Sequence, residues 1–127
     1  MIVLDASAAV LALCNDGAAR RALARETVMI PHLADSDVTD ALRAQVIGGQ
    51  IGADEAQAAL ARWVRLGVRR FSVVGLVARL WELRDTLTAS DATYVALAEA
   101  LACPLLTADA RLAQAPGPRC PITVVPR

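Results

Sequence analysis

Four aspartates are the residues of this sequence whose positions best suit chemistry: Asp5, Asp37, Asp91 and Asp109. Asp5 ends the short apolar run 2–5, and Asp109 comes just past a second run, 104–107. Both runs are too short for helices, so they are predicted to be buried strands. Ligands of open α/β sheets bind at the carboxyl ends of the strands, so these two carboxylates are expected to face one crevice.

The other two aspartates are predicted to reach the same crevice from helices. The sequence Thr88-Ala-Ser-Asp91 has the form of a capping box, which marks a helix N-terminus. Asp37 is the only acid on the inner stripe of a helix predicted over residues 32–47. The chain has no lysine to neutralise such a cluster, and its carboxylates would raise one another's pKa. A hard divalent cation, Mg²⁺ or Mn²⁺, resolves that repulsion and can activate water against a phosphodiester.

Each of these acids also has an ordinary structural alternative. Asp5 and Asp109 are placed to cap the helices that follow them, and Asp91 could be only the acid of its capping box. Asp37 has no such role if its helix begins near His32. The position of Asp37 therefore favours a function more strongly than the other three positions do.

Two hydroxyl residues and several further acids lie near the candidate positions. Ser7 and Thr107 are expected to orient the cluster, with capping of a turn as the alternative. Asp40 is predicted to point away from the inner stripe of its helix, within reach of Arg43. The remaining acids near these segments are interpreted as caps or solvated charges: Asp35, Asp54 and Asp85.

The elements that must position these residues alternate along the chain. Strands are predicted over residues 2–5, 28–30, 71–74, 104–107 and 122–125. Helices are predicted over residues 6–14, 18–25, 32–47, 54–66, 76–85 and 88–102. This alternation indicates an α/β fold with a mostly parallel sheet covered on both faces. Because no linker or repeat interrupts the 127 residues, one domain over 1–127 is predicted.

Composition argues against several classes of protein. The formal charge is zero, so no bulk attraction to nucleic acid is expected. No stretch approaches ~20 apolar residues, and Asp5 interrupts the apolar N-terminus, so neither a transmembrane helix nor a signal peptide is predicted. The three cysteines form no CxxC pair and are interpreted as reduced thiols of a cytoplasmic protein. The absence of lysine also disfavours receiver-type and haloacid-dehalogenase-like phosphotransfer, which use a lysine near the first aspartate.

Four blocks of sequence carry a family resemblance over nearly the whole chain: LDASA at 4–8, PHLADSDVTDALR at 31–43, LTASDATYVALAEAL at 87–101 and PLLTADARL at 104–112. They resemble the PIN-domain ribonucleases, in particular the VapC toxins of bacterial toxin–antitoxin pairs. The resemblance implies a three-layer α/β/α sandwich that cleaves RNA with Mg²⁺ or Mn²⁺, forms a homodimer and is silenced by a cognate antitoxin protein. It also implies a metal site of four acids with two supporting hydroxyls: Asp5, Asp37, Asp91, Asp109, Ser7 and Thr107.

Two residues depart from the family pattern. The second acidic position is typically Glu, whereas this chain has Asp37, and the residue before the third acid, often aromatic, is Ser90. The shorter acid withdraws its carboxylate by about 1.5 Å. Mn²⁺ is therefore expected to support activity better than Mg²⁺, whose octahedral geometry is stricter. The alternative function is a catalytically degenerate PIN domain that binds RNA or protein.

A basic cluster beside a tryptophan is a candidate partner surface. The arginines gather at the end of the predicted 54–66 helix and beyond it: Arg62, Arg65, Arg69 and Arg70. The resemblance places an antitoxin helix in the groove between the 32–47 and 54–66 helices. Trp63 is therefore expected to contact the antitoxin or a second subunit, with a packed tryptophan on a solvated helix as the alternative.

Overall fold

In the computed structural model, which describes all 127 residues, strands alternate with helices as the sequence predicts. The strands are β1 (Ile2–Leu4), β2 (Val28–Pro31), β3 (Arg69–Phe71), β4 (Leu105–Thr107) and β5 (Ile122–Val124). The helices are α1 (Ala6–Cys14), α2 (Ala18–Arg25), α3 (Ala34–Ile47), α4 (Ala53–Trp63), a 3-10 turn η1 (Val74–Leu76), α5 (Val77–Glu82), α6 (Ala89–Ala100) and α7 (Ala110–Gln114). None of them has the length and hydropathy needed to cross a membrane.

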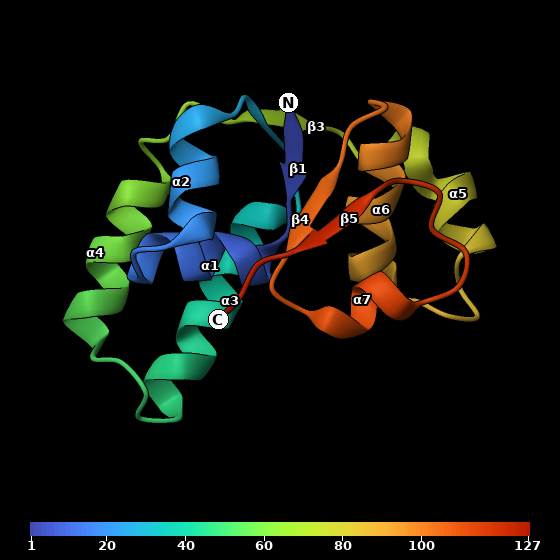
Figure 1. Cartoon of the computed structure of the whole chain (residues 1–127). Helices are drawn as coiled ribbons and strands as arrows, with labels where there is room; N and C mark the ends of the chain where they lie inside the picture. The colour runs from blue at the N-terminus through green and yellow to red at the C-terminus, as the bar shows by residue number, and fades with distance from the viewer.

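All five strands run parallel, in the order β3-β2-β1-β4-β5. Crossovers between parallel strands are right-handed, so helices that connect strands in opposite directions along the sheet lie on opposite faces. Helices α1 to α4 accordingly lie on one side of the sheet and α5 to α7 on the other (Figure 1). The predicted three-layer α/β sandwich is confirmed, and its strand order reverses between β1 and β4, where such sheets bind ligands.

The three central strands are buried because helices cover both of their faces. Every residue of β1, β2 and β4 is buried, whereas β3 and β5 at the edges are mostly exposed. Helix α6 packs against all three central strands, and its residues from Ala92 to Ala98 are all buried. The N-terminal end of α6, which carries Asp91, is therefore held firmly against the sheet.

The register between β1 and β4 fixes the first aspartate opposite a threonine. Val3 pairs with Leu105 and Leu4 with Leu106, and the next pair in this register is Asp5 with Thr107. Because residues side by side in parallel strands point to the same face, the side chains of Asp5 and Thr107 meet.

Helix α3 begins later than predicted, and this changes the interpretation of Asp37. Residues 32 and 33 form a turn after β2, and α3 begins at Ala34 rather than His32. Asp37 consequently lies in the first helical turn, where unpaired N–H groups favour a negative charge. The predicted start of this helix at His32 is therefore wrong, but no side chain caps α3, and the Asp37 carboxylate accepts its hydrogen bonds from α6 instead.

Several other strand and helix boundaries differ from the predicted ones. Strand β3 occupies residues 69–71 rather than 71–74, since it pairs in register with residues 29–31 of β2. The turn η1 takes Val74 from the predicted strand and Leu76 from the predicted 76–85 helix, which shortens to α5. Helix α4 ends at Trp63 rather than near Leu66, because residues 64–66 form turns.

Candidate functional site

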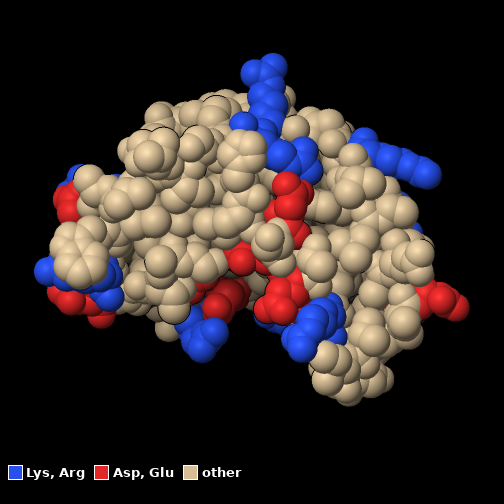
Figure 2. All heavy atoms as spheres, turned by 180° about the vertical axis from the view of Figure 1, so that it is seen from behind, with Lys and Arg blue, Asp and Glu red and all other residues tan.

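The four aspartates singled out in the sequence line a single pocket of about 250 Å³ at the carboxyl ends of β1 and β4. Its wall is completed by small and hydroxyl side chains and one further acid: Ala6, Ser7, Asp40, Ala41, Ala44, Ser90 and Tyr94. Acidic side chains gather in a hollow near the middle of the face shown in Figure 2, with basic side chains beside it. Residues from α1, α3, α6 and the end of β4 thus meet at the point where the strand order reverses.

Asp5 is held on both of its carboxylate oxygens. Oδ1 accepts hydrogen bonds from Ser7 Oγ at 2.7 Å and from the amide of Ala8 at 2.9 Å, and Oδ2 accepts one from Thr107 Oγ1. Ser7 Oγ in turn accepts a hydrogen bond from the amide of Ala108 at 2.9 Å. Asp5 therefore caps α1 and is also a fixed carboxylate of the pocket, and Ser7 and Thr107 orient it as the sequence suggested.

Asp109 faces an arginine that the sequence interpretation overlooked. As N-cap of α7 it accepts a hydrogen bond from the amide of Arg111 at 3.0 Å. The Arg111 guanidinium donates to both carboxylate oxygens, at 3.2 Å to Oδ1 and 3.1 Å to Oδ2. This guanidinium holds the pKa of Asp109 below its usual value. The expectation that the four acids raise one another's pKa is therefore wrong for Asp109.

Asp91 is the acid whose environment disfavours its charge. Burial raises the pKa of Asp91, and the charges of Asp5 and Asp109 raise it further. Its amide donates to Thr88 Oγ1 at 3.2 Å, so the predicted helix cap is present. The shift shows that Asp91 shares one electrostatic environment with the acids that follow β1 and β4.

Asp37 is bound to α6 through one oxygen. Its Oδ2 accepts hydrogen bonds from Ser90 Oγ at 2.7 Å and from Tyr94 Oη at 3.0 Å. Tyr94 is only 2% exposed, and burial together with the charge of Asp37 strongly raises the pKa of its hydroxyl. Sequence patterns gave no sign of this contact, because it joins residues 53 and 57 positions apart.

Asp40 belongs to the pocket, although it was expected to point away from it. The predicted ion pair with Arg43 is present at 3.6 Å, yet Asp40 also lines the pocket. Asp37 and Asp40 are three residues apart on α3, and residues at this spacing are neighbours on one helix face. That spacing was the signal in the sequence that could have identified Asp40.

The pocket fits a divalent cation by the type of its donors. Carboxylate oxygens are the ligands that hard divalent ions prefer, and five acids line the wall. However, no three His, Cys, Asp or Glu side chains are grouped closely enough to hold one metal ion. Asp109 instead faces Arg111, and Asp37 faces Ser90 of α6.

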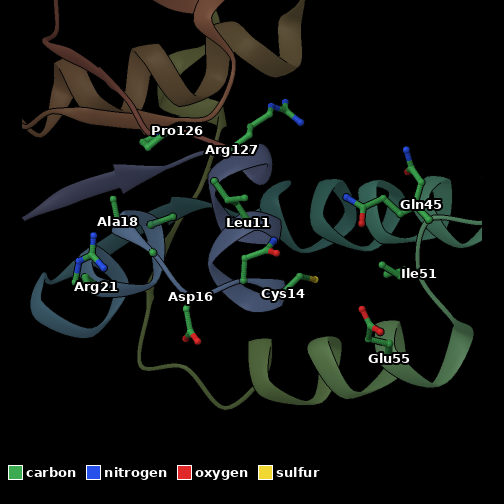
Figure 3. A pocket seen from close by; sticks show the side chains of 14 residues that line it. Leu11, Cys14, Asp16, Ala18, Arg21, Gln45, Ile51, Glu55, Pro126 and Arg127 are labelled. Atoms are coloured by element: carbon green, nitrogen blue, oxygen red, sulfur yellow. The ribbon is translucent and has the colours of Figure 1, made fainter.

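A larger cavity of about 810 Å³ lies elsewhere and shares no lining residue with the aspartate pocket. Figure 3 shows it between α1, α2, the α3–α4 connection and the C-terminal residues. Its acids come from separate elements, and one of them, Asp16, is already paired with Arg20 at 2.7 Å. Size alone therefore does not identify the site of chemistry in this fold.

Trp63 is buried inside the protein and offers no surface for a partner to contact. It is 2% exposed, and its indole Nε1 donates to Asp35 Oδ1 at 2.8 Å. Asp35 also accepts two hydrogen bonds from Arg70, at 2.8 and 2.9 Å. The prediction that Trp63 contacts a partner is wrong, as is the interpretation of Asp35 as a cap or solvated charge. Together these residues fasten the start of α3 to the end of α4 and to β3.

Comparison with known proteins identifies the family. The family model described as "PIN domain" matches residues 2–118. Ribonuclease VapC9 of Mycobacterium tuberculosis and a VapC ribonuclease of Mycobacterium bovis are each 54% identical to this chain over 127 residues, covering 100% of both chains. Ribonuclease VapC1 of M. tuberculosis is 44% identical, covering 97% of this chain and 96% of the relative.

Solved structures share the fold at lower identity. The VapC20 toxin of M. tuberculosis, described as cleaving the sarcin–ricin loop, has a TM-score of 0.68 and 23% identity, covering 90% of this chain and 94% of its own. VapBC2 of Rickettsia felis, bound to a promoter DNA fragment, has a TM-score of 0.71 and 13% identity, covering 98% of this chain and 99% of its own. The whole-length match to the VapC relatives, together with the PIN model, shows that this chain belongs to the VapC ribonucleases of the PIN-domain family.

Proposed function

We propose that this protein is a metal-dependent endoribonuclease, the toxin of a type II toxin–antitoxin system, and that it hydrolyses RNA phosphodiesters in the aspartate pocket. Relatives named ribonuclease VapC, 54% identical over the whole chain, support the activity. The observation that carries the assignment to this pocket is the convergence of Asp5, Asp91 and Asp109 at the reversal of strand order.

The acids of the pocket differ in how firmly their carboxylates are held in position. Asp5 is immobilised by three donors and supplies a carboxylate of defined direction. Asp91, with its raised pKa, is the acid best suited to hold a proton while the pocket is free of cations. Asp109 is adjustable, because its partner Arg111 is exposed and exposed ion pairs are weak. Once released, that guanidinium can make paired hydrogen bonds to an RNA phosphate.

VapC ribonucleases generally depend on a divalent metal. We propose that Asp5, Asp37, Asp91 and Asp109 hold it here, with Mn²⁺ favoured over Mg²⁺. A bound divalent cation lowers the pKa of water and stabilises the leaving oxygen of the phosphodiester. The contribution of the protein is to set the direction of each carboxylate before the RNA arrives.

Two protein partners complete the proposal, a cognate antitoxin and a second copy of the chain. An apolar groove of about 270 Å³ lies between α3 and α4, lined by Leu42, Val46, Ile47 and Leu60 among others. Ile47 is 70% exposed there, so an amphipathic antitoxin helix could bury it. We assign this groove to the antitoxin, since Trp63, which was expected to contact it, is buried.

A catalytically degenerate binding module is the competing function. The observation in its favour is that no three ligands are grouped for a metal ion. The two functions differ in turnover, because a binding module retains RNA or protein partners without producing new RNA ends.

A panel of RNAs digested with Mg²⁺, Mn²⁺ or EDTA tests the proposal. We expect divalent-dependent cleavage that falls at least about 100-fold in Asp5→Asn. Asparagine keeps an oxygen for Ser7 and Ala8, so the fold should survive, as circular dichroism will show. Undiminished cleavage by Asp5→Asn, or full activity in excess EDTA, would rule out the proposed site.

A further inference from the structure

Two hydroxyl groups of α6 converge on the same oxygen of Asp37. Ser90 Oγ lies 2.7 Å and Tyr94 Oη 3.0 Å from Oδ2. Because Ser90 and Tyr94 are four residues apart, they occupy one face of the helix, one turn from each other. The contact therefore binds the first turn of α3 to the first two turns of α6 across the pocket.

The second oxygen of Asp37 is left for the pocket. Oδ1 accepts no hydrogen bond from the protein, whereas both donors act on Oδ2. Asp37, Ser90, Asp91 and Tyr94 all line the pocket. Helix α6 thus carries Asp91, one acid of the pocket. The same helix carries Ser90 and Tyr94, whose hydroxyl groups hold Asp37 on α3.

We infer that Ser90 and Tyr94 are positioning residues, which hold Asp37 by one oxygen so that the other alone serves the cation site. The inference rests on the proposed function and deepens it. It also connects the two departures from the family pattern, because a short acid at position 37 and a small hydroxyl residue at position 90 form one hydrogen-bonded unit.

The alternative explanation is a purely structural tie between α3 and α6. Both explanations predict that removing a hydroxyl lowers stability, so stability cannot separate them. Cation affinity can, because a structural tie does not act on the cation through Asp37. Residues that orient metal ligands typically change metal affinity roughly 10- to 100-fold when substituted.

The decisive measurement is calorimetric binding of Mn²⁺ and Mg²⁺ to the full chain without RNA. Tyr94→Phe and Ser90→Ala each remove one hydroxyl and keep the remaining packing, and they are compared singly and together. Thr93→Val is the matched control, since Thr93 is also buried on α6 but its hydroxyl donates to the carbonyl of Ala89 at 2.7 Å.

We expect the double variant to bind Mn²⁺ roughly 10- to 100-fold more weakly than the wild type. Mg²⁺ affinity should fall more than Mn²⁺ affinity, because Mg²⁺ demands stricter geometry. Thr93→Val should bind both ions normally. In an Asp37→Ala background the same two hydroxyl substitutions should have no further effect, since the group they position is gone.

Each other outcome has a definite meaning. Wild-type affinity in the double variant overturns the inference, as does a loss that persists undiminished in the Asp37→Ala background. Mn²⁺ binding by a wild-type protein that cleaves no RNA overturns the proposed function and leaves the positioning result standing. A wild-type protein that binds neither ion overturns both.

Discussion

The guanidinium of Arg111 occupies both carboxylate oxygens of Asp109, at 3.2 Å to Oδ1 and 3.1 Å to Oδ2. Asp109 follows β4 at the centre of the sheet and lines the aspartate pocket. The negative charge of Asp109, an acid of the proposed metal site, is thus already neutralised by the guanidinium of Arg111. A metal ion bound at the proposed site would therefore compete with Arg111 for this carboxylate.

The first prediction concerns this competition. Arg111→Gln should bind Mn²⁺ more tightly than the wild type at low salt, because no positive charge has to be displaced from Asp109. The gain should be no more than about fivefold and should shrink as salt is added, since exposed ion pairs are weak and screened. Titration calorimetry at two salt concentrations measures it. Weaker Mn²⁺ binding by Arg111→Gln would contradict competition and indicate that Arg111 supports the site.

The second prediction concerns the pH dependence of stability. The pKa of Asp91 is raised in the fold, so the folded state favours the protonated carboxyl, and ionisation costs stability as pH rises above the ordinary pKa of about 3.9. In EDTA, Asp91→Asn should therefore raise the midpoint of thermal unfolding by a few degrees near neutral pH. The gain should shrink towards about pH 4, where the carboxyl is already protonated.

Asp85→Asn, which removes an exposed charge from the turn before α6, is the matched control and should change little. A lower midpoint for Asp91→Asn at neutral pH would show that the charged form of Asp91 stabilises the fold, contrary to its surroundings.

The third prediction concerns Tyr94, the only tyrosine of the chain. Burial and the neighbouring Asp37 raise its pKa well above the usual value, which is about 10 for tyrosine. Phenolate absorbance should therefore stay flat through that pH while circular dichroism reports a folded protein. Asp37→Asn should allow ionisation at lower pH than in the wild type. A normal tyrosine titration in the folded wild type would disprove the contact between Tyr94 and Asp37.

The fourth prediction concerns the short acid at position 37. Asp37→Glu moves the carboxylate about 1.5 Å further along its side chain, so it should raise Mg²⁺-dependent turnover relative to Mn²⁺-dependent turnover. Asp37→Ala should nearly abolish both. Asp35→Ala, which breaks the contacts to Trp63 and Arg70, should lower stability without changing metal preference. If Asp37→Ala stays active while Asp40→Ala is inactive, Asp40 is the acid that matters.

The sequence was sufficient for the parts of the site that depend on local signals. Short apolar runs located β1 and β4, and parallel strands bring their carboxyl ends to one edge, so the meeting of Asp5 and Asp109 followed from pattern alone. A helix cap located Asp91 in the same way. These signals are local because strand ends and helix starts are decided by neighbouring residues.

Contacts made by the packing of distant elements were beyond such signals. No periodicity reveals that Tyr94 reaches Asp37, because the contact joins two helices that are far apart in the sequence. Trp63 was taken for a surface residue, since nothing local shows that Asp35 receives its indole. Arg111 lies only two positions after Asp109, but no local pattern shows that its guanidinium takes the neutralising role that a lysine could have.

The pairing of Asp5 with Thr107 has a consequence for how this protein is made. The two residues are separated by 102 positions, and β4 joins the sheet beside β1, the first strand of the chain. During synthesis Asp5 therefore precedes most of its pocket, which is not complete until β4 and Asp109 have emerged from the ribosome. A fragment that lacks β4 and Asp109 therefore lacks part of the aspartate pocket, so the site is complete only after residues far apart in the sequence have folded together.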